Sequence, residues 1–186
     1  MIKTRKDLKL YISEDKKRYG NVTSFTKIFG HSEQWYIWKV IYSVRLLEFY
    51  KNNCTNRVNK VIYTLLNIRH HKLMKNTGIY IFPNVFGPGL YIPHLGTIHV
   101  SGVAKIGKNC TIRPGVLIVS NLGVSNKKLR PIIIGDNVEF SEGCKILCRK
   151  IGDNVIVGPN CTVFKNIPNN TTVYSPQCKY LSHDDI

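Results

Sequence analysis

Apolar residues in the first 76 positions recur at the spacing of amphipathic helices. Between Trp35 and Phe49 they lie three or four positions apart, so that they share one face of a helix. This part of the chain has no proline and only two of the 14 glycines. The pattern predicts three helices, at residues 4–18, 32–52 and 56–75. The apolar side of the third helix is predicted to consist of Val58, Val61, Ile62, Leu65, Leu66 and Ile68.

From residue 77 onward, large apolar residues recur every six positions. Six residues rotate a helix by roughly 600°, so residues at this step share no helical face, whereas they share one face of a strand. One long strand is also excluded, because the position two residues after each large residue is often lysine, proline or a carboxylate. The chain must therefore bend at every step. The large residues, in three runs with a short extension, are Val100, Ile106, Ile112, Ile118; Ile134, Phe140, Ile146; Ile151, Val157, Val163; and Ile167, Val173.

The position four residues after each large residue is small or β-branched. One large and one small inward side chain per step indicate short strands that wind into a coil, with each coil stacking on the next. The sequence thus predicts a β-solenoid over residues 77–186, a domain distinct from the helical region at 1–76. Cys110, Cys144 and Cys161 occupy the small position, and we expect them in the core because a free cysteine packs as a small hydrophobe.

The six-residue step stops between Val119 and Ile133. The intervening segment is polar, carries three basic residues and separates two regular runs of the same repeat. We therefore expect an extruded loop at residues 120–133. A long loop on a rigid scaffold is usually functional.

Four segments carry closely related hexapeptides: Ile106-Gly-Lys-Asn-Cys-Thr, Ile134-Gly-Asp-Asn-Val-Glu, Ile151-Gly-Asp-Asn-Val-Ile and Val157-Gly-Pro-Asn-Cys-Thr. They resemble the repeats of the left-handed β-helix acyltransferases. The segment from Phe86 to Ile98, the loop and the ending Ile-Pro-Asn-Asn-Thr-Thr-Val are similar to serine acetyltransferases, above all to the short members associated with cell-surface polysaccharide synthesis. The resemblance implies a left-handed parallel β-helix with an N-terminal α-helical cap, assembled as homotrimers that bind acetyl-CoA between neighbouring subunits.

The resemblance also implies acetyl transfer from acetyl-CoA to a hydroxyl group. An alcohol needs a positioned base before it attacks a thioester, and histidine is suited to that task near neutral pH. His94, in Ile-Pro-His-Leu-Gly, stands where the family has its catalytic histidine, so we expect it to be the general base. Pro93 and Tyr80 stand where serine acetyltransferases have aspartates. These departures favour a sugar hydroxyl of a surface-polysaccharide pathway as the acceptor, with L-serine, and hence cysteine biosynthesis, as the alternative.

Further residues are expected to contact the substrates. The tripeptide Leu129-Arg130-Pro131 stands where the family has Arg-His-Pro, and Arg113 replaces a small or amide-bearing residue. A permanently charged arginine binds an anionic acceptor or polarises the thioester oxygen. The residues predicted to contact the acceptor are Tyr80, Arg113 and Arg130. Those predicted to contact coenzyme A are Lys165 and Lys179, through its phosphates, and Ser141 and Gly158, along its pantetheine arm.

The charge balance suggests an anionic partner. The chain has 27 lysines and arginines against 11 acidic residues, a net charge of +16, and 16 of the basic residues lie in the first 76 positions. No motif for specific nucleic-acid recognition accompanies them, so no nucleic-acid partner is expected. Peripheral contact with an anionic membrane, or a non-catalytic binding module, are the alternatives. The basic residues of the third predicted helix are Arg57, Lys60, Arg69, Lys72 and Lys75.

The sequence predicts neither a metal site nor an export signal. His94 and His99 have the gap found in β-solenoid carbonic anhydrases, but the place of a third zinc ligand falls near Val58, so no metal is expected. The six cysteines form no CxxC pair. The first twenty residues have no apolar core of a signal peptide. We therefore expect reduced thiols and a cytoplasmic location.

Overall fold

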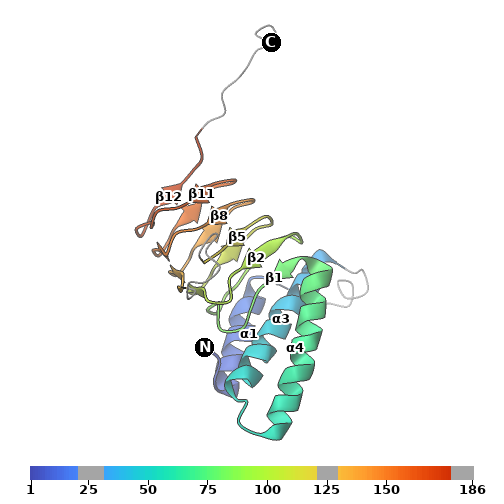
Figure 1. Ribbon diagram of the computed structural model, residues 1–186. Coiled ribbons are helices and arrows are strands. Elements are labelled where there is room, and N and C mark those ends of the chain that lie inside the picture. The colour runs from blue at the N-terminus through green and yellow to red at the C-terminus, as the bar shows by residue number, and fades with distance from the viewer. Residues whose placement is uncertain (21–31, 121–129, 177–186) are drawn as a thin grey trace.

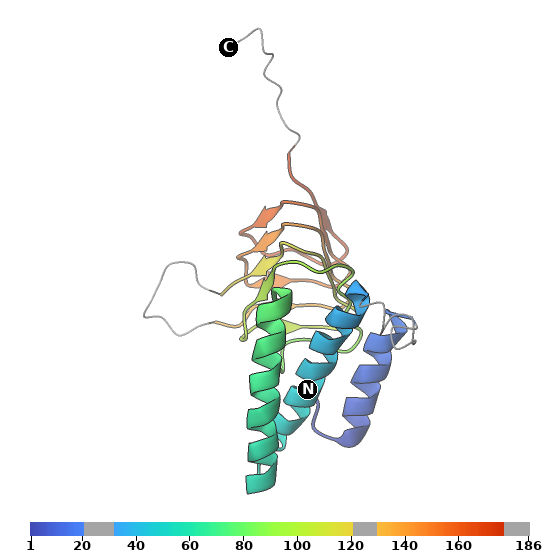
Figure 2. The same ribbon diagram turned by 90° about the vertical axis from the view of Figure 1, so that its right-hand side faces the viewer.

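The structure, a computed structural model, describes residues 1–20, 32–120 and 130–176. Within these residues, three helices lie at one end, and a stack of short strands extends from them towards the C-terminal end (Figure 1). The helices run side by side in one layer (Figure 2). Their bounds, close to those predicted from the apolar spacing, are α1 (Arg5–Lys17), α3 (Glu33–Asn52) and α4 (Arg57–Thr77).

Local sequence explains where the helices begin and end. Thr4 caps α1 in a capping box: its hydroxyl accepts from the Asp7 N–H at 3.1 Å, and the Asp7 carboxylate accepts from the Thr4 N–H at 2.8 Å. Gly78 ends α4 in the left-handed conformation, with φ 73°, and donates its N–H to the Met74 carbonyl at 2.9 Å. The first strand begins one residue later, at Ile79.

The described part of the chain contains twelve strands of two or three residues in three parallel sheets. The first sheet has the order β1-β2-β5-β8-β11, the second β3-β6-β9 and the third β12-β10-β7-β4. The chain visits the first, second and third sheets in turn, so each circuit is one three-sided coil. The strands are β1 (Ile79–Tyr80), β2 (Ile98–Val100), β3 (Lys105–Ile106), β4 (Thr111–Ile112), β5 (Leu117–Ile118), β6 (Ile133–Ile134), β7 (Glu139–Phe140), β8 (Lys145–Ile146), β9 (Lys150–Ile151), β10 (Ile156–Val157), β11 (Thr162–Val163) and β12 (Thr172–Val173).

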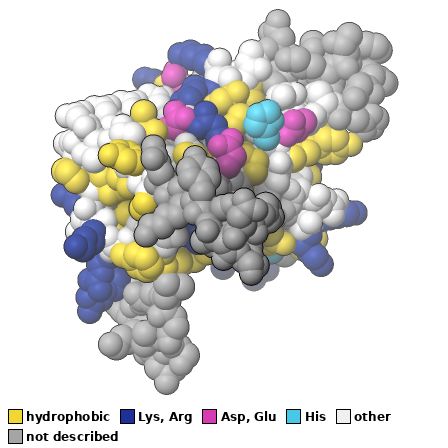
Figure 3. Space-filling model, turned by 90° about the horizontal axis from the view of Figure 1, so that it is seen from above, with side chains coloured by type: hydrophobic (Ala, Val, Ile, Leu, Met, Phe, Trp, Pro, Cys, Tyr) yellow, Lys and Arg dark blue, Asp and Glu magenta, His cyan; other side chains and the backbone are white. Residues whose placement is uncertain are grey.

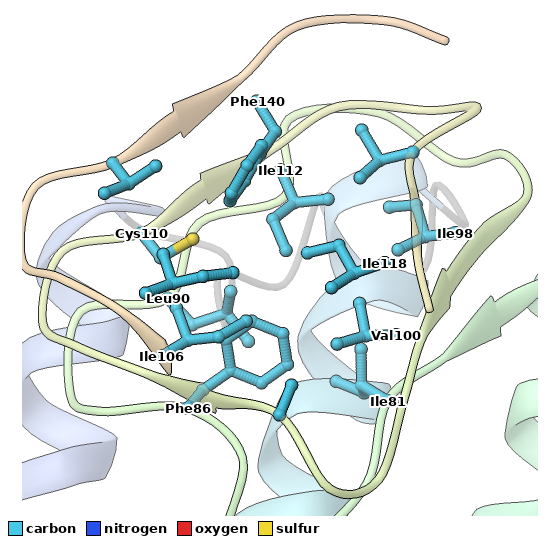
Figure 4. Close-up of a cluster of buried hydrophobic side chains, with 14 of the residues drawn as sticks. Ile81, Phe86, Leu90, Ile98, Val100, Ile106, Cys110, Ile112, Ile118 and Phe140 are labelled. Atoms are coloured by element: carbon cyan, nitrogen blue, oxygen red, sulfur yellow. The ribbon is translucent and has the colours of Figure 1, made fainter. Parts of the chain in front are cut away.

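The interior of the coils is filled by the residues that set the six-residue step. All of them from Val100 to Ile167 are buried, and Val173 in the last strand is half-buried. Figure 4 shows such side chains pointing inward, with Cys110 among them. Cys144 and Cys161 are buried as well, which confirms the prediction for these three cysteines. Burial raises the pKa of the Cys144 thiol to about 12, so it packs as a neutral side chain.

Asparagines turn the corner between the second and third sheets. Asn109, Asn137, Asn154 and Asn170 adopt φ of 54–56°, the left-handed region that asparagine tolerates better than most residues. Each of the first three donates its side-chain amide to the next asparagine along the stack, at 2.9–3.0 Å. The sequence predicts a bend two residues after each large residue. In the structure, the residue with left-handed φ is the asparagine one position later, three residues after the large residue.

A buried ion pair joins two helices to the first coil. Arg45 of α3 lies against Asp15 of α1, with Nε 2.8 Å from Oδ2, and both side chains are at most 1% exposed. The Asp15 carboxylate also accepts from the N–H groups of Gly89 and Leu90, at 2.8 and 2.9 Å. Arg45 donates to the carbonyl groups of Phe86 and Gly87, at 2.8 and 2.7 Å. This network fixes α1 and α3 against residues 86–90.

The prediction for the apolar side of α4 is wrong for four of its six residues. Val58, Val61, Leu65 and Ile68 are exposed, whereas Ile62 and Leu66 are half-buried. The fully buried residues of α4 are His70 and Met74, which lie on the side facing α3. The helix is apolar on two sides, and hydrophobic spacing alone does not tell which side meets the core.

Candidate active site

His94 lies at a corner of the first coil, where the chain passes from the third sheet to the first. Residue Tyr91 pairs with Thr111 of the third sheet, and Ile98 begins β2 of the first sheet. The His94 side chain is 62% exposed. The coil therefore presents an imidazole that a dissolved substrate can reach.

A carboxylate from a helix accompanies this imidazole. Glu33, in the first turn of α3, places Oε2 3.5 Å from Nδ1 of His94. Its Oε1 accepts a short hydrogen bond from the N–H of Leu95, the residue after His94. The same carboxylate therefore touches both the ring and the backbone of this corner. Among the described residues, Nε2 of His94 makes no hydrogen bond.

The sequence analysis missed Glu33. It lies 62 positions before Leu95, and an acidic residue in the first turn of a helix is already favoured by the helix dipole. No local signal in the sequence connects it to His94. The carboxylate thus comes from α3, and not from the coil positions occupied by Pro93 and Tyr80.

Three other predicted residues stack above His94 at the same corner. Arg113, Ser141 and Gly158 each stand two positions before a residue of positive φ, as His94 does before Gly96. Backbone hydrogen bonds link these coils in order: Gly115 to Thr97 at 2.7 Å, Gly143 to Pro114 at 2.9 Å and Asn160 to Glu142 at 2.8 Å. We call this column of residues, 93–97, 113–115, 141–143 and 158–160, the His94 corner. Seen from above, a histidine lies among acidic and basic side chains on the surface of the molecule (Figure 3).

Arg113 is held by two carboxylates at the His94 corner. Its guanidinium forms a short contact with Glu139, and its Nε lies 3.5 Å from Glu142. The hydrogen bond with Glu139 is the main cause of a raised pKa for Arg113. The side chain is 30% exposed, so a substrate anion can reach it only in competition with these two carboxylates. The corner thus offers a fixed positive charge bordered by negative ones.

The structure places Gly158 against the next coil and Tyr80 on a face of the stack. Gly158 is buried, and a Cβ there would come 3.0 Å from the Val173 carbonyl oxygen, so contact with the next coil already favours glycine. Tyr80 pairs with His99 in adjacent strands of the first sheet, with ring centroids 5.8 Å apart. It therefore lies on a flat face of the stack next to His99.

Arg130 and Lys165 lie at a different corner, between the first and second sheets. Arg130 lines a cavity of about 210 Å³ with Ser120, Arg149 and Phe164, and its carbonyl accepts a hydrogen bond from the Ser120 hydroxyl. Lys165 follows Phe164 and is exposed. We call this the Arg130 corner. Residues 121–129 of the predicted loop and Lys179 lie outside the described residues.

Within residues 1–20, 32–120 and 130–176, no three His, Cys, Asp or Glu side chains gather in an arrangement that could hold a metal ion. No described helix is both long enough and apolar enough to cross a bilayer.

Comparison with known proteins identifies relatives by structure only. No protein-family model matches the chain, and no curated protein sequence matches it. Among solved structures, serine acetyltransferase from Neisseria gonorrhoeae matches 94% of this chain and 66% of its own length, with a TM-score of 0.61 and 20% identity. The soybean serine acetyltransferase apoenzyme matches 90% of this chain and 66% of its own, with a TM-score of 0.67 and 19% identity.

The fold is that of the serine acetyltransferases. Serine acetyltransferase 1 from Entamoeba histolytica also matches, over 91% of this chain and 62% of its own, with a TM-score of 0.63 and 19% identity. The chain thus spans about two thirds of the length of the enzymes it matches. Together with the three parallel sheets, these neighbours fit the left-handed parallel β-helix that the hexapeptides predict.

Proposed function

We propose that the protein is an acetyl-CoA-dependent O-acetyltransferase in which His94 is the general base. The observation that supports this most is the exposed His94, paired through Nδ1 with Glu33, on a fold shared with serine acetyltransferases. A carboxylate at one ring nitrogen stabilises the imidazolium that forms when the other nitrogen accepts a proton. Nε2 is therefore the atom that takes the proton of the acceptor hydroxyl.

The reaction balances with this single base. The acceptor oxygen attacks the thioester carbonyl of acetyl-CoA as its proton passes to Nε2 of His94. The carbon–sulfur bond then breaks, and the leaving thiolate of coenzyme A takes the proton back, so that His94 is neutral again at the end. Glu33 favours the charged intermediate state of the ring without exchanging a proton itself.

A sugar hydroxyl of a surface-polysaccharide pathway is the acceptor that we favour. The positions of the two aspartates of serine acetyltransferases are Pro93 and Tyr80 here, and Tyr80 packs against His99. These positions offer no carboxylate to the ammonium group of serine. L-serine is the second candidate, because solved neighbours include a soybean serine acetyltransferase complexed with serine. An amino acid carries an ammonium group, which Glu139 and Glu142 would bind, and a carboxylate, which Arg113 beside them would bind.

An assay of coenzyme A release identifies the acceptor. Purified protein is incubated with acetyl-CoA and either L-serine or a panel of sugars and nucleotide sugars, and the free thiol and the acetylated product are measured. We expect acceptor-dependent release with a sugar and an O-acetyl ester in the product. Release with serine alone would replace the sugar by the second candidate, and no release with any hydroxyl acceptor would contradict the transferase proposal.

The complete site is expected to lie between subunits of a homotrimer. His94 and Arg130 occupy different corners of one chain, so one copy does not bring them together unless a neighbour is placed against it. In a ring of three subunits, the His94 corner of each subunit faces the Arg130 corner of the next. All three interfaces of such a ring are identical. Lys165 then stands near the phosphates of coenzyme A, and Ser141 and Gly158 line the path of its pantetheine arm.

A mixture of inactive variants tests the shared site. His94→Ala and Arg130→Ala are each expected to be nearly inactive, but co-assembled chains regain activity, because an interface can take His94 from one variant and Arg130 from the other. Random assembly restores about a quarter of the wild-type rate. The rate is measured after co-expression, with the unmixed variants as controls. Failure to recover any activity from mixed trimers would place both residues in one subunit's site.

A further inference from the structure

Four aliphatic side chains form an exposed stripe along α4. Val58, Val61, Leu65 and Ile68 are 67, 59, 62 and 63% exposed. They lie three and four positions apart, and at 100° per residue they fall within one narrow sector of the helix surface. We call them the outer stripe of α4.

The outer stripe is separate from the contact that holds α4 in the protein. The opposite side of the helix packs on α3, where His70 is buried. Its Nε2 donates to the Ile81 carbonyl at 2.9 Å, and its Nδ1 lies 3.3 Å from the Ser43 hydroxyl. Met74 is buried on the same side. A helix that is apolar on a second, exposed side usually has a second partner.

The charge of α4 determines what kind of partner fits the stripe. Its sequence, from Arg57 to Thr77, contains five lysines and arginines and no acidic residue. On a helical projection Arg69 borders the stripe, and Lys72 falls in line with it one turn beyond Ile68. The same helix of a second copy would bring five like charges against these five. A partner with a negatively charged surface and an apolar interior fits the outer stripe and its basic neighbours better.

A groove beside α4 extends this surface. It has a volume of about 420 Å³ and is lined by residues of α1, α3 and α4. Two tryptophans, Trp35 and Trp38, and Tyr42 provide aromatic surface there, and Lys16, Lys39 and Arg69 provide positive charge. Arg69 lines the groove and borders the outer stripe, so the two features adjoin. Aromatic rings and lysines of this kind are typical of surfaces at the boundary between lipid headgroups and acyl chains.

We propose that α4 is a docking surface for an anionic lipid bilayer. The outer stripe enters the boundary between headgroups and acyl chains, while Arg69 and Lys72 contact lipid phosphates. The helix lies along the membrane surface and does not cross it. Nucleic acid is the poorer partner, because aliphatic side chains on the stripe offer no stacking surface for bases. The proposal is independent of the acetyl-transfer reaction and goes beyond it.

Co-sedimentation of the full-length protein with vesicles tests the proposal. Vesicles of phosphatidylcholine alone are compared with vesicles that also contain phosphatidylglycerol, each at low and at high salt. We expect binding to the mixed vesicles, weakened by salt, and little binding to the neutral ones. Leu65→Ser with Ile68→Ser removes the apolar contribution, and Arg69→Gln with Lys72→Gln removes two charges; each pair lowers the affinity by about tenfold or more.

Matched variants on the coils show whether the effect belongs to α4. Tyr174→Ser removes an 80% exposed apolar side chain, and Lys145→Gln removes an exposed charge of the first sheet. Both are expected to bind vesicles as the wild type does. Circular dichroism and thermal melting of all variants confirm that they are folded, which is expected because the substituted side chains are exposed.

Several results would overturn the proposal. They are equal binding to neutral and anionic vesicles, binding that salt does not weaken, and unchanged binding of the stripe and charge variants. Concentration-dependent self-association that the stripe variant abolishes, without vesicle binding, would make the stripe an interface between copies. Binding of RNA in the absence of vesicle binding would make α4 a nucleic-acid surface.

Discussion

Replacing His94 by alanine is expected to lower kcat for acetyl transfer by about 10³-fold, because a general base contributes 10²- to 10⁴-fold to such a step. The KM for acetyl-CoA should change little, since the imidazole acts on the acceptor proton. The side chain is 62% exposed, so its removal leaves no cavity and the melting temperature should stay within a few degrees of wild type. Steady-state kinetics and thermal melting are the measurements.

Two substitutions of Glu33 serve as the comparison for His94. Glu33→Gln keeps an oxygen for the N–H of Leu95 but removes the charge beside Nδ1, whereas Glu33→Ala removes both contacts. We expect the amide to lower kcat by about tenfold and alanine by more, because the half-buried carboxylate, beside a ring that is largely exposed, stabilises the imidazolium only moderately. Wild-type activity of His94→Ala would refute the mechanism. Wild-type activity of Glu33→Gln alone would refute the role of the carboxylate.

Replacing Asp15 by alanine is expected to destabilise the protein by about 3–5 kcal/mol, the cost of breaking a buried ion pair by removing one member. Arg45 would remain in a site where it is 1% exposed, and the N–H groups of Gly89 and Leu90 would lose their acceptor. Chemical denaturation followed by circular dichroism measures the loss. The helices and residues 86–90 should separate first, because this network joins them.

Glu14 provides the control on the same helix. Its ion pair with Lys17 is exposed, at 33 and 67%, and such pairs contribute at most about 1 kcal/mol. Glu14→Ala should therefore unfold almost as the wild type does. Arg45 also lies 3.7 Å from the buried carboxylate of Glu48. Replacing all three groups, as Asp15→Leu with Arg45→Met and Glu48→Gln, should therefore cost less than Asp15→Ala, since no charge is left unpaired. Equal stability of Asp15→Ala and Glu14→Ala would contradict the role assigned to the network.

The pattern of large residues was enough to predict the coils. Ile106, Ile134 and Ile151 each begin a hexapeptide of the same pattern and lie in register in neighbouring strands of the second sheet. A short repeated step leaves few ways to bury the same side chain on every circuit, so local spacing defines the tertiary arrangement. The family resemblance pointed to His94, whereas its place at an exposed corner of the first coil was seen only in the structure.

The sequence by itself determined the repeating elements, because each strand and helix is specified by residues only a few positions apart. Contacts between distant residues were decided by tertiary structure. Glu33 reaches the His94 corner from 62 positions before Leu95, and Asp15 reaches Gly89 across 74, because α1 and α3 pack against the first coil. The same packing buries one apolar side of α4 and leaves Leu65 and Ile68 exposed. Hydrophobic spacing is identical on either side of a helix, so only the packed fold determines which side meets the core.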